Sequence, residues 1–246
     1  MRRLLVLAAL CAAVSVQVAS AADMPTKAPA YKAVEPIPYN WSGFYIGGHL
    51  GGAWSNSDRS SFNTDTGALL DSATQTATSF IGGGQIGFNW MFAPNWLVGI
   101  EADISAADLS ANDITVTATT VNHANKIDYF GTVRGRLGYA WQNWLLYGTG
   151  GYAWAHDTAT RTQLIGTVNA DTPGTVETPT NTLTGWTAGG GLEWGFAGNW
   201  SARVEYLFMD FGTDSFIYPG AHRRDDYNTH VSVARVGLNY RFDWGR

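Results

Sequence analysis

Two residues of this chain have the types and the spacing needed for nucleophilic chemistry, His230 and Ser232. Side chains two positions apart in a β-strand lie on the same face, so these two would be neighbours in an extended segment. A histidine can activate a serine for attack on an acyl ester, and Asp210 has the same parity in the preceding segment. The simpler interpretation, which we favour, is that polar residues begin where an apolar band of the strand ends.

The sequence offers little else that points to a reaction centre. The glycine runs at 82–84 and 189–191 lack the following helix and the Lys-Ser/Thr of a phosphate loop, so they indicate close strand packing instead. The histidines are scattered, without ligand spacing on one element: His49, His123, His156, His222 and His230. We therefore expect no metal, no cofactor and no enzymatic activity.

Eight charged residues occur at alternate positions of otherwise apolar segments, which predicts that they share one face of a sheet. Buried charges are tolerated only when they are paired, so equal numbers of acids and bases indicate an interior ion-pair network. In one half of it, two acids face two bases on a neighbouring strand: Glu101 and Asp103 with Arg134 and Arg136. In the other, Glu193 and Glu205 pair with Arg203 and Arg235. The alternative is that all eight line a water-filled pore.

Sequence periodicity in steps of two predicts eight strands that would position these charges. They cover about residues 44–54, 80–92, 96–105, 126–141, 144–155, 186–196, 200–208 and 235–242. The fifth is the least regular, because Leu145 and Tyr147 interrupt its alternation. In the fourth, Ile127 is assigned to the apolar face, and Lys126 and Asp128 to the charged face.

The connections between these strands alternate in length. Tight turns at 93–95, 142–143 and 197–199 alternate with long polar connections at about 55–78, 109–125, 156–181 and 212–227. This is typical of outer-membrane barrels, which have short periplasmic turns and long outer loops. The dipeptide Asn-Trp occurs five times, three of them at the tight turns, and tryptophan prefers the membrane–water boundary. A periplasmic aromatic girdle is therefore predicted from Trp41, Trp90, Trp96, Trp141, Trp144, Trp194 and Trp200.

The direction of the alternation distinguishes a membrane barrel from a soluble one of the lipocalin type. Eight strands enclose room for a single packed set of side chains, and the aromatic and branched face is too large to fit inside. That face must point outward, toward lipid. The fold predicted is all-β, an eight-stranded antiparallel transmembrane up-and-down β-barrel. Arginine and glutamate side chains would fill its narrow lumen, so we expect a closed or barely conducting interior.

The N-terminal end of the chain indicates export. Residues 1–21 have the basic start, apolar stretch and small-residue cleavage site of a signal peptide. Its removal takes away Arg2 and Arg3, so the formal net charge of −5 becomes −7, which argues against a nucleic-acid partner. Residues 22–40 are expected to be a Pro-rich periplasmic linker, and residues 41–246 the barrel. Cys11, the single cysteine, lies in the signal peptide, so no disulfide is expected.

Four glycine-aromatic motifs resemble the OmpA-like small outer-membrane barrels, specifically the alphaproteobacterial surface antigens of the "porin family". The motifs are Trp41–Trp54, Gly82–Trp90, Gly131–Tyr139 and Val236–Phe242, and the resemblance covers about residues 41–242. It implies an abundant protein of the Gram-negative outer membrane that supports envelope integrity and presents surface loops. Lipids and lipopolysaccharide would then surround the barrel.

The resemblance also implies an assembly signal. The alternating residues at the end of the last strand are similar to the C-terminal signal that the barrel assembly machinery recognises: Val236, Leu238, Tyr240 and Phe242. This chain departs from the pattern by adding residues 243–246 after the usual terminal phenylalanine.

Three functions are compatible with these features. The leading hypothesis is a structural outer-membrane barrel with at most weak pore activity. The first alternative is a general or selective porin, which conductance and oligomeric state would distinguish. The second is a lipid A-modifying enzyme, because the pair His230 and Ser232 resembles that of the outer-membrane lipid A deacylases. The long loops carry no motif that predicts an extracellular ligand.

Overall fold

The computed structural model describes residues 39–116, 120–167 and 171–242. They belong to a compact unit, Ile37–Arg246, and the fold below is that of this unit. The predicted signal peptide, residues 22–38 of the predicted linker, and residues 243–246 lie outside the described residues.

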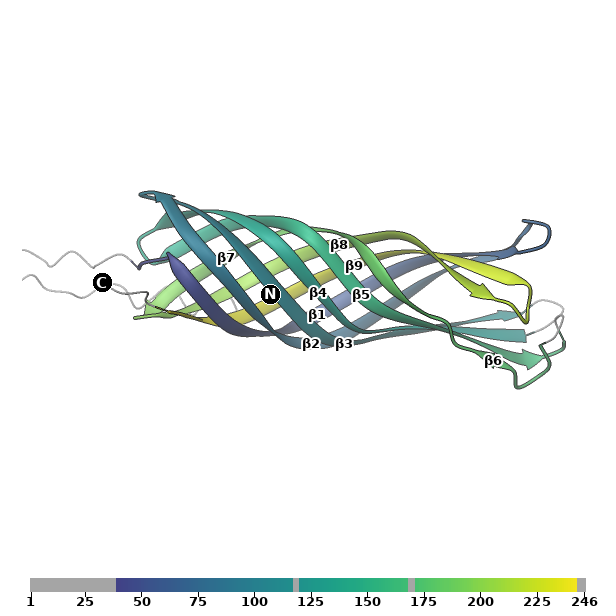
Figure 1. Ribbon diagram of the computed structural model, residues 1–246. Coiled ribbons are helices and arrows are strands. Elements are labelled where there is room, and N and C mark those ends of the chain that lie inside the picture. Colours follow the sequence, from purple (N-terminus) through teal and green to yellow (C-terminus); the bar gives the residue numbers. More distant parts are fainter. Residues whose placement is uncertain (1–38, 117–119, 168–170, 243–246) are drawn as a thin grey trace, which may run out of the picture. The chain divides into compact units, whose positions relative to one another are not determined.

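One antiparallel sheet curls into a closed barrel (Figure 1). Its strand order is β4-β3-β2-β1-β9-β8-β7-β5, and β4 also pairs with β5, which closes the ring, while the two-residue β6 is attached to β5. The predicted eight-stranded antiparallel barrel is confirmed. The strands are β1 (Gly43–Asn63), β2 (Leu69–Ala93), β3 (Trp96–Val116), β4 (Thr120–Trp141), β5 (Trp144–Ile165), β6 (Val176–Glu177), β7 (Thr180–Ala197), β8 (Trp200–Tyr218) and β9 (Arg223–Arg241).

The wall of the barrel follows the alternation of side chains in the sequence. On β2, Phe80 and Ile86 are exposed on the outside, whereas Gln85 and Asn89 are buried inside. On β5, the irregular positions Leu145 and Tyr147 are both buried in the interior. A wall that faces lipid requires aromatic and branched side chains on the outside and polar groups on the inside.

The strands run much further than the sequence predicts. β2 has 25 residues, whereas about ten suffice to cross a membrane in a tilted strand. Most of the four segments expected to be loops are therefore extended strand, and the turn between β1 and β2 is only residues 64–68. The alternation of apolar and polar residues is lost in these segments, because Thr, Ser and Asn replace apolar residues on their outer face. Threonine still favours the β conformation, so pairing continues.

The predicted faces of the start of the fourth strand are wrong. A β-bulge between Ile127 and Tyr129 shifts the register of β4 against β5. One extra residue reverses the faces on one side of a bulge. Ile127 is consequently buried in the interior, while the side chains of Lys126 and Asp128 are 49% and 41% exposed.

The long-strand end of the barrel divides into two arms (Figure 1). β2 pairs with β3 only from Gly82 and Ala106 toward the tight turns, and β7 pairs with β8 only from Trp186 and Asp210. Beyond these points, the first arm consists of β8, β9, β1 and β2, and the second of β3, β4, β5 and β7. Two seams without ladder pairing therefore separate the arms.

The interior is filled in layers. At the tight-turn end lies an apolar cluster of Trp41, Leu97, Ala140, Leu145 and Tyr147. Toward the long-strand end, past the charged residues described below, an apolar layer includes Ile81, Phe130, Leu183, Met209 and Val231. A further apolar cluster around Phe216 and Tyr227 lies between the arms, close to their tips.

Candidate functional site

The eight charged residues predicted to face the interior lie together in the middle of the barrel. Each is at most 5% exposed. Five strands supply them, and where a strand supplies two, they are two positions apart because alternate side chains share a face. They are Glu101 and Asp103 of β3, Arg134 and Arg136 of β4, Glu193 of β7, Arg203 and Glu205 of β8, and Arg235 of β9.

Arg134 is at the centre of this ion-pair cluster. Its Nη2 atom lies 2.5 Å from Glu101 Oε1 and 2.9 Å from Asp103 Oδ2. Its Nη1 atom lies 3.0 Å from Glu205 Oε1, on a strand that is not a neighbour of β4. The planar guanidinium thus joins three carboxylates in a fixed geometry.

The other arginines also reach across the lumen. Arg203 Nη1 lies 2.5 Å from Glu101 Oε2, and Arg136 Nη2 lies 2.9 Å from Glu193 Oε2. Arg235 lies 3.0 Å from Asp103 and 2.6 Å from Glu205. The closest ion pair of Glu193 is therefore with Arg136, and not with Arg203 or Arg235 as the order of strands predicts. The lumen is narrow enough for opposite walls to meet, which strand order does not reveal.

Two tyrosines that were not predicted from the sequence complete the cluster. The Tyr45 hydroxyl donates to Glu101 Oε2 at 2.6 Å, and the Tyr147 hydroxyl donates to Glu205 Oε1 at 3.0 Å. The Arg136 guanidinium lies 4.2 Å from the centroid of the Tyr147 ring. Tyr147 could have been identified from the sequence, because it lies at an inward-facing position of a strand whose outward face is already apolar.

The cluster is electrically balanced and closely surrounded. Four carboxylates face four guanidinium groups, so the formal charges cancel, as burial requires. Ser201 and Asn239 donate to the remaining oxygen of Glu193. Near the tight-turn mouth, a cavity beside Tyr39, Trp41 and Tyr45 measures only about 10 Å³. Such a space holds about one water molecule, which is no path for a solute.

Six of the seven predicted girdle tryptophans are exposed on the outer face of the barrel, and Trp41 is not. Trp41 is 2% exposed and packs against Tyr39 inside the tight-turn mouth. It precedes β1, which begins at Gly43 with a φ of +131°, and belongs to the interior apolar cluster at this end. Its assignment to the girdle is therefore wrong. The exposed six are Trp90, Trp96, Trp141, Trp144, Trp194 and Trp200.

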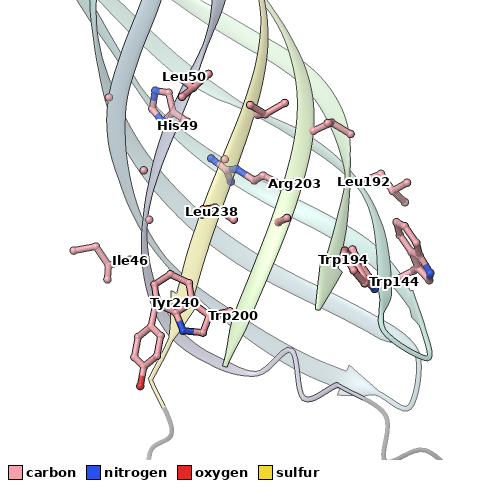
Figure 2. Close-up of a pocket in the computed structure, with 17 residues that line it drawn as sticks. Ile46, His49, Leu50, Trp144, Leu192, Trp194, Trp200, Arg203, Leu238 and Tyr240 are labelled. Atoms are coloured by element: carbon pink, nitrogen blue, oxygen red, sulfur yellow. The ribbon is translucent and has the colours of Figure 1, made fainter. Parts of the chain in front are cut away.

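The girdle borders a broad apolar hollow of about 1100 Å³ on the outer wall (Figure 2). Ile46 and Trp144 project outward from the wall, whereas Arg203 points to the interior (Figure 2). The rings of Trp144 and Trp194 stack with centroids 5.9 Å apart. This surface is large, apolar and edged by indole rings, which is the chemistry of an acyl-chain boundary.

The residues similar to an assembly signal alternate along the end of β9, and the last of them, Phe242, directly follows the strand. Val236, Leu238 and Phe242 are 47%, 51% and 45% exposed on the outer face. The Tyr240 ring contacts Trp200 and Phe242 edge to face. The last strand therefore presents one continuous apolar and aromatic outer face.

The residues of the candidate nucleophilic pair have other partners. His230 Nε2 lies 3.7 Å from Asp210 Oδ2, beyond hydrogen-bond distance. The Ser232 hydroxyl accepts a hydrogen bond of 3.1 Å from the Tyr206 hydroxyl. The Phe208 ring lies 5.8 Å from the His230 ring, so the histidine packs on an aromatic side chain at the border of the apolar band. This is the arrangement that the simpler interpretation predicts.

The described residues contain no group of three or more His, Cys, Asp or Glu side chains that could hold a metal ion. Within the same part of the chain, no helix is long and apolar enough to cross a membrane.

A second polar cluster lies between the two arms. Arg59 of the first arm binds Asp71, and across to the second arm it donates to Asp113 at 3.1 Å. His123 of the second arm lies 3.1 Å from Asp225 of the first. This cluster is not predicted from the sequence because it lies in segments expected to be loops.

Asp157, which lies beyond the apolar band, has no cation among its side-chain hydrogen-bond partners. Its Oδ2 atom accepts 3.2 Å from Asn125 Nδ2, and burial raises the pKa of the carboxyl from 3.8 to about 7. Because this pKa is raised on folding, the stability it contributes is present at about pH 4 and is lost as the pH rises through about 7.

Asp157→Asn is therefore expected to flatten the pH dependence of stability. Between about pH 4 and pH 8, the free energy of unfolding of the unsubstituted protein should fall more than that of the variant, by on the order of 2–4 kcal/mol. Urea unfolding in detergent micelles measures both, and Asp128→Asn, at an exposed carboxylate, should keep the slope of the unsubstituted protein. Identical slopes for Asp157→Asn and the unsubstituted protein would contradict the assignment.

Comparisons with known proteins agree on one family. A model described as "Outer membrane protein beta-barrel domain" matches residues 5–242. The chain is 31% identical to the 31 kDa outer-membrane immunogenic protein of Brucella melitensis over 231 residues, 91% of this chain and 93% of that protein. It is 29% identical to the 22 kDa outer membrane protein of Rhizobium leguminosarum, covering 82% of this chain and 79% of that protein. A 25 kDa outer-membrane immunogenic protein of Brucella abortus is 28% identical, covering 93% and 98%.

Proposed function

The chain belongs to the outer membrane protein β-barrel domain family, and from this premise we propose that it is a structural component of the outer membrane. In this role it supports envelope integrity and displays the arms of its long-strand end at the cell surface, with at most weak pore activity. The observation that carries the proposal is the filled interior. A balanced cluster of eight buried charges lies between two apolar layers, so the described residues leave no wide path along the barrel axis.

The outer face supports a direct role in the membrane. The exposed tryptophan rings at the tight-turn end and the apolar hollow that they border are suited to contact with lipid acyl chains. Outer-membrane lipids and lipopolysaccharide are therefore the proposed surroundings of the barrel. The alternating outer face of β9 is the segment we expect the barrel assembly machinery to recognise: Val236, Leu238, Tyr240 and Phe242.

The two alternatives have less support. A general or selective porin needs an open lumen, whereas Arg134, Arg203 and Arg235 occupy the middle of this one. A lipid A-modifying enzyme needs a histidine in contact with its nucleophile, whereas Ser232 bonds to Tyr206. The Brucella relatives are named as outer-membrane immunogenic proteins.

Deletion and complementation in the source bacterium test the structural role. Loss of the chain should increase sensitivity to bile salts and to large antibiotics, and expression of the unsubstituted chain should reverse this. Ser232→Ala should complement equally well, since the proposal assigns no catalysis to it. A deletion strain with an intact barrier but slower uptake of small solutes would contradict the structural role and favour the porin.

A further inference from the structure

Among the described residues, one side of β2 has no ladder partner in the long-strand half. Pairing with β3 stops at Gly82, whereas pairing with β1 continues to Leu69. In an antiparallel ladder, alternate residues direct their N–H and C=O groups to opposite sides. Every second residue between Leu69 and Thr78 therefore presents both groups to the seam. At Ser79 the edge is already in contact with β3, because the side-chain hydroxyl accepts a hydrogen bond of 3.0 Å from the backbone N–H of Asp108. Free edges of this kind are templates for another strand.

The other three edges at the seams carry features that discourage strand addition. β3 has a register shift between Ala106 and Leu109 and carries Asp108 and Asp113. β8 has a bulge after Asp210, with Gly212 at φ +65°. The free part of β7 is only residues 180–185 and follows Pro179. Bulges, charges, proline and short length are the usual means of protecting an edge.

The β2 edge carries none of these from Ser72 to Ser79. This segment, Ser-Ala-Thr-Gln-Thr-Ala-Thr-Ser, has no charged residue, glycine or proline, and its register with β1 is regular. Three of its residues are threonine, which favours the β conformation. Its outward side chains are exposed: Ser72, Thr74, Thr76 and Thr78.

The same segment is symmetric about its centre. Residues 73–77 read Ala-Thr-Gln-Thr-Ala in both directions. If two copies are paired antiparallel about Gln75, then Thr74 faces Thr76 of the other copy and Ser72 faces Thr78. Such pairs are hydrogen-bonding and free of like charges, and cross-strand threonine pairs stabilise sheets. We propose that the β2 edge binds the β2 edge of a second copy, in one continuous sheet across both.

The proposed pairing dictates how the two barrels are placed. A twofold rotation relates two identical strands that pair antiparallel. The same rotation reverses the direction of the barrel axis in the second copy. Copies in one membrane all point the same way, so an antiparallel pair joins barrels of two opposing outer membranes, arm against arm. The β2 edge is thus a contact between cells or vesicles. This goes beyond the proposed structural role, and an assay without living cells separates the two.

Nanodiscs that each hold one barrel provide the test, because both faces of the disc are free. Discs with the unsubstituted chain should form pairs in analytical ultracentrifugation. The double variants Ser72→Lys/Thr78→Lys and Ser72→Glu/Thr78→Glu place like charges opposite each other, so each should associate at least about tenfold more weakly. An equal mixture of the two places lysine opposite glutamate, and pairing should return.

The control adds the same charge away from the edge. Asn56→Lys/Asn228→Lys lies on β1 and β9, in the middle of the first arm, and should leave pairing unchanged. Heat-modifiable electrophoresis establishes that every variant is folded. In addition, Thr74→Cys in one population and Thr76→Cys in the other should form a mixed disulfide. Three results would each overturn the proposal: single discs of the unsubstituted chain up to about 100 µM, no recovery in the mixture, or pairs that persist in both charged variants.

Discussion

Arg134→Ala is expected to lower the free energy of unfolding by about 3–5 kcal/mol. The substitution removes one cationic partner from each of Glu101, Asp103 and Glu205 at once, at distances of 2.5, 2.9 and 3.0 Å. All three carboxylates stay buried, so the loss of attraction is not compensated by water. Urea unfolding in detergent micelles, followed by tryptophan fluorescence, measures the change.

Arg224→Ala is the matched control for this experiment. Arg224 also pairs with a carboxylate, Asp226, but its side chain is 45% exposed near the tip of the first arm. Exposed pairs contribute about 0–1 kcal/mol, so this variant should unfold nearly as the unsubstituted protein does. Equal stability of Arg134→Ala and Arg224→Ala would mean that the interior cluster does not hold the barrel together.

Gly83→Ala is expected to destabilise the barrel by about 2–4 kcal/mol, although it adds a single methyl group. A Cβ atom at position 83 would overlap the backbone oxygen of Ile104 on β3 and would lie 2.8 Å from His49 Nε2. The backbone cannot move without breaking the β2–β3 ladder, which is already limited to the half near the tight turns. The same unfolding assay measures the loss.

The neighbouring glycine is the control for this prediction. Gly82 faces outward, and a Cβ atom there would have only the His49 backbone oxygen nearby, at 3.9 Å. Gly82→Ala should therefore change stability by less than about 1 kcal/mol. If both alanine variants unfolded alike, close strand approach at Gly83 would not be a constraint on the fold.

The sequence predicts the membrane half of the barrel well because one physical rule governs it. Side chains alternate between lipid and lumen, so Ile100 and Glu101 fall on opposite faces whatever the remaining fold is. The same rule brings all eight charges inside. It fails in the arms, where the outer face is largely polar and Thr74 or Thr76 gives no apolar period.

Other features depend on the closed three-dimensional ring. The pair of Arg203 with Glu101 crosses the lumen between strands that are not neighbours. The bulge that turns Ile127 inward depends on the register against β5. Trp41 has the same Asn-Trp motif as Trp96, Trp144 and Trp200, but it precedes the first strand, and a local pattern does not show that difference.

Planar-bilayer recording of purified barrels is the most direct test of the closed interior. Insertion is established independently by protection of the barrel from added protease. Inserted monomers of the unsubstituted chain should produce no stable conductance steps, because buried side chains fill the lumen from the tight-turn mouth to the arms. Large, stable steps from monomers would contradict the account and would make the chain a porin.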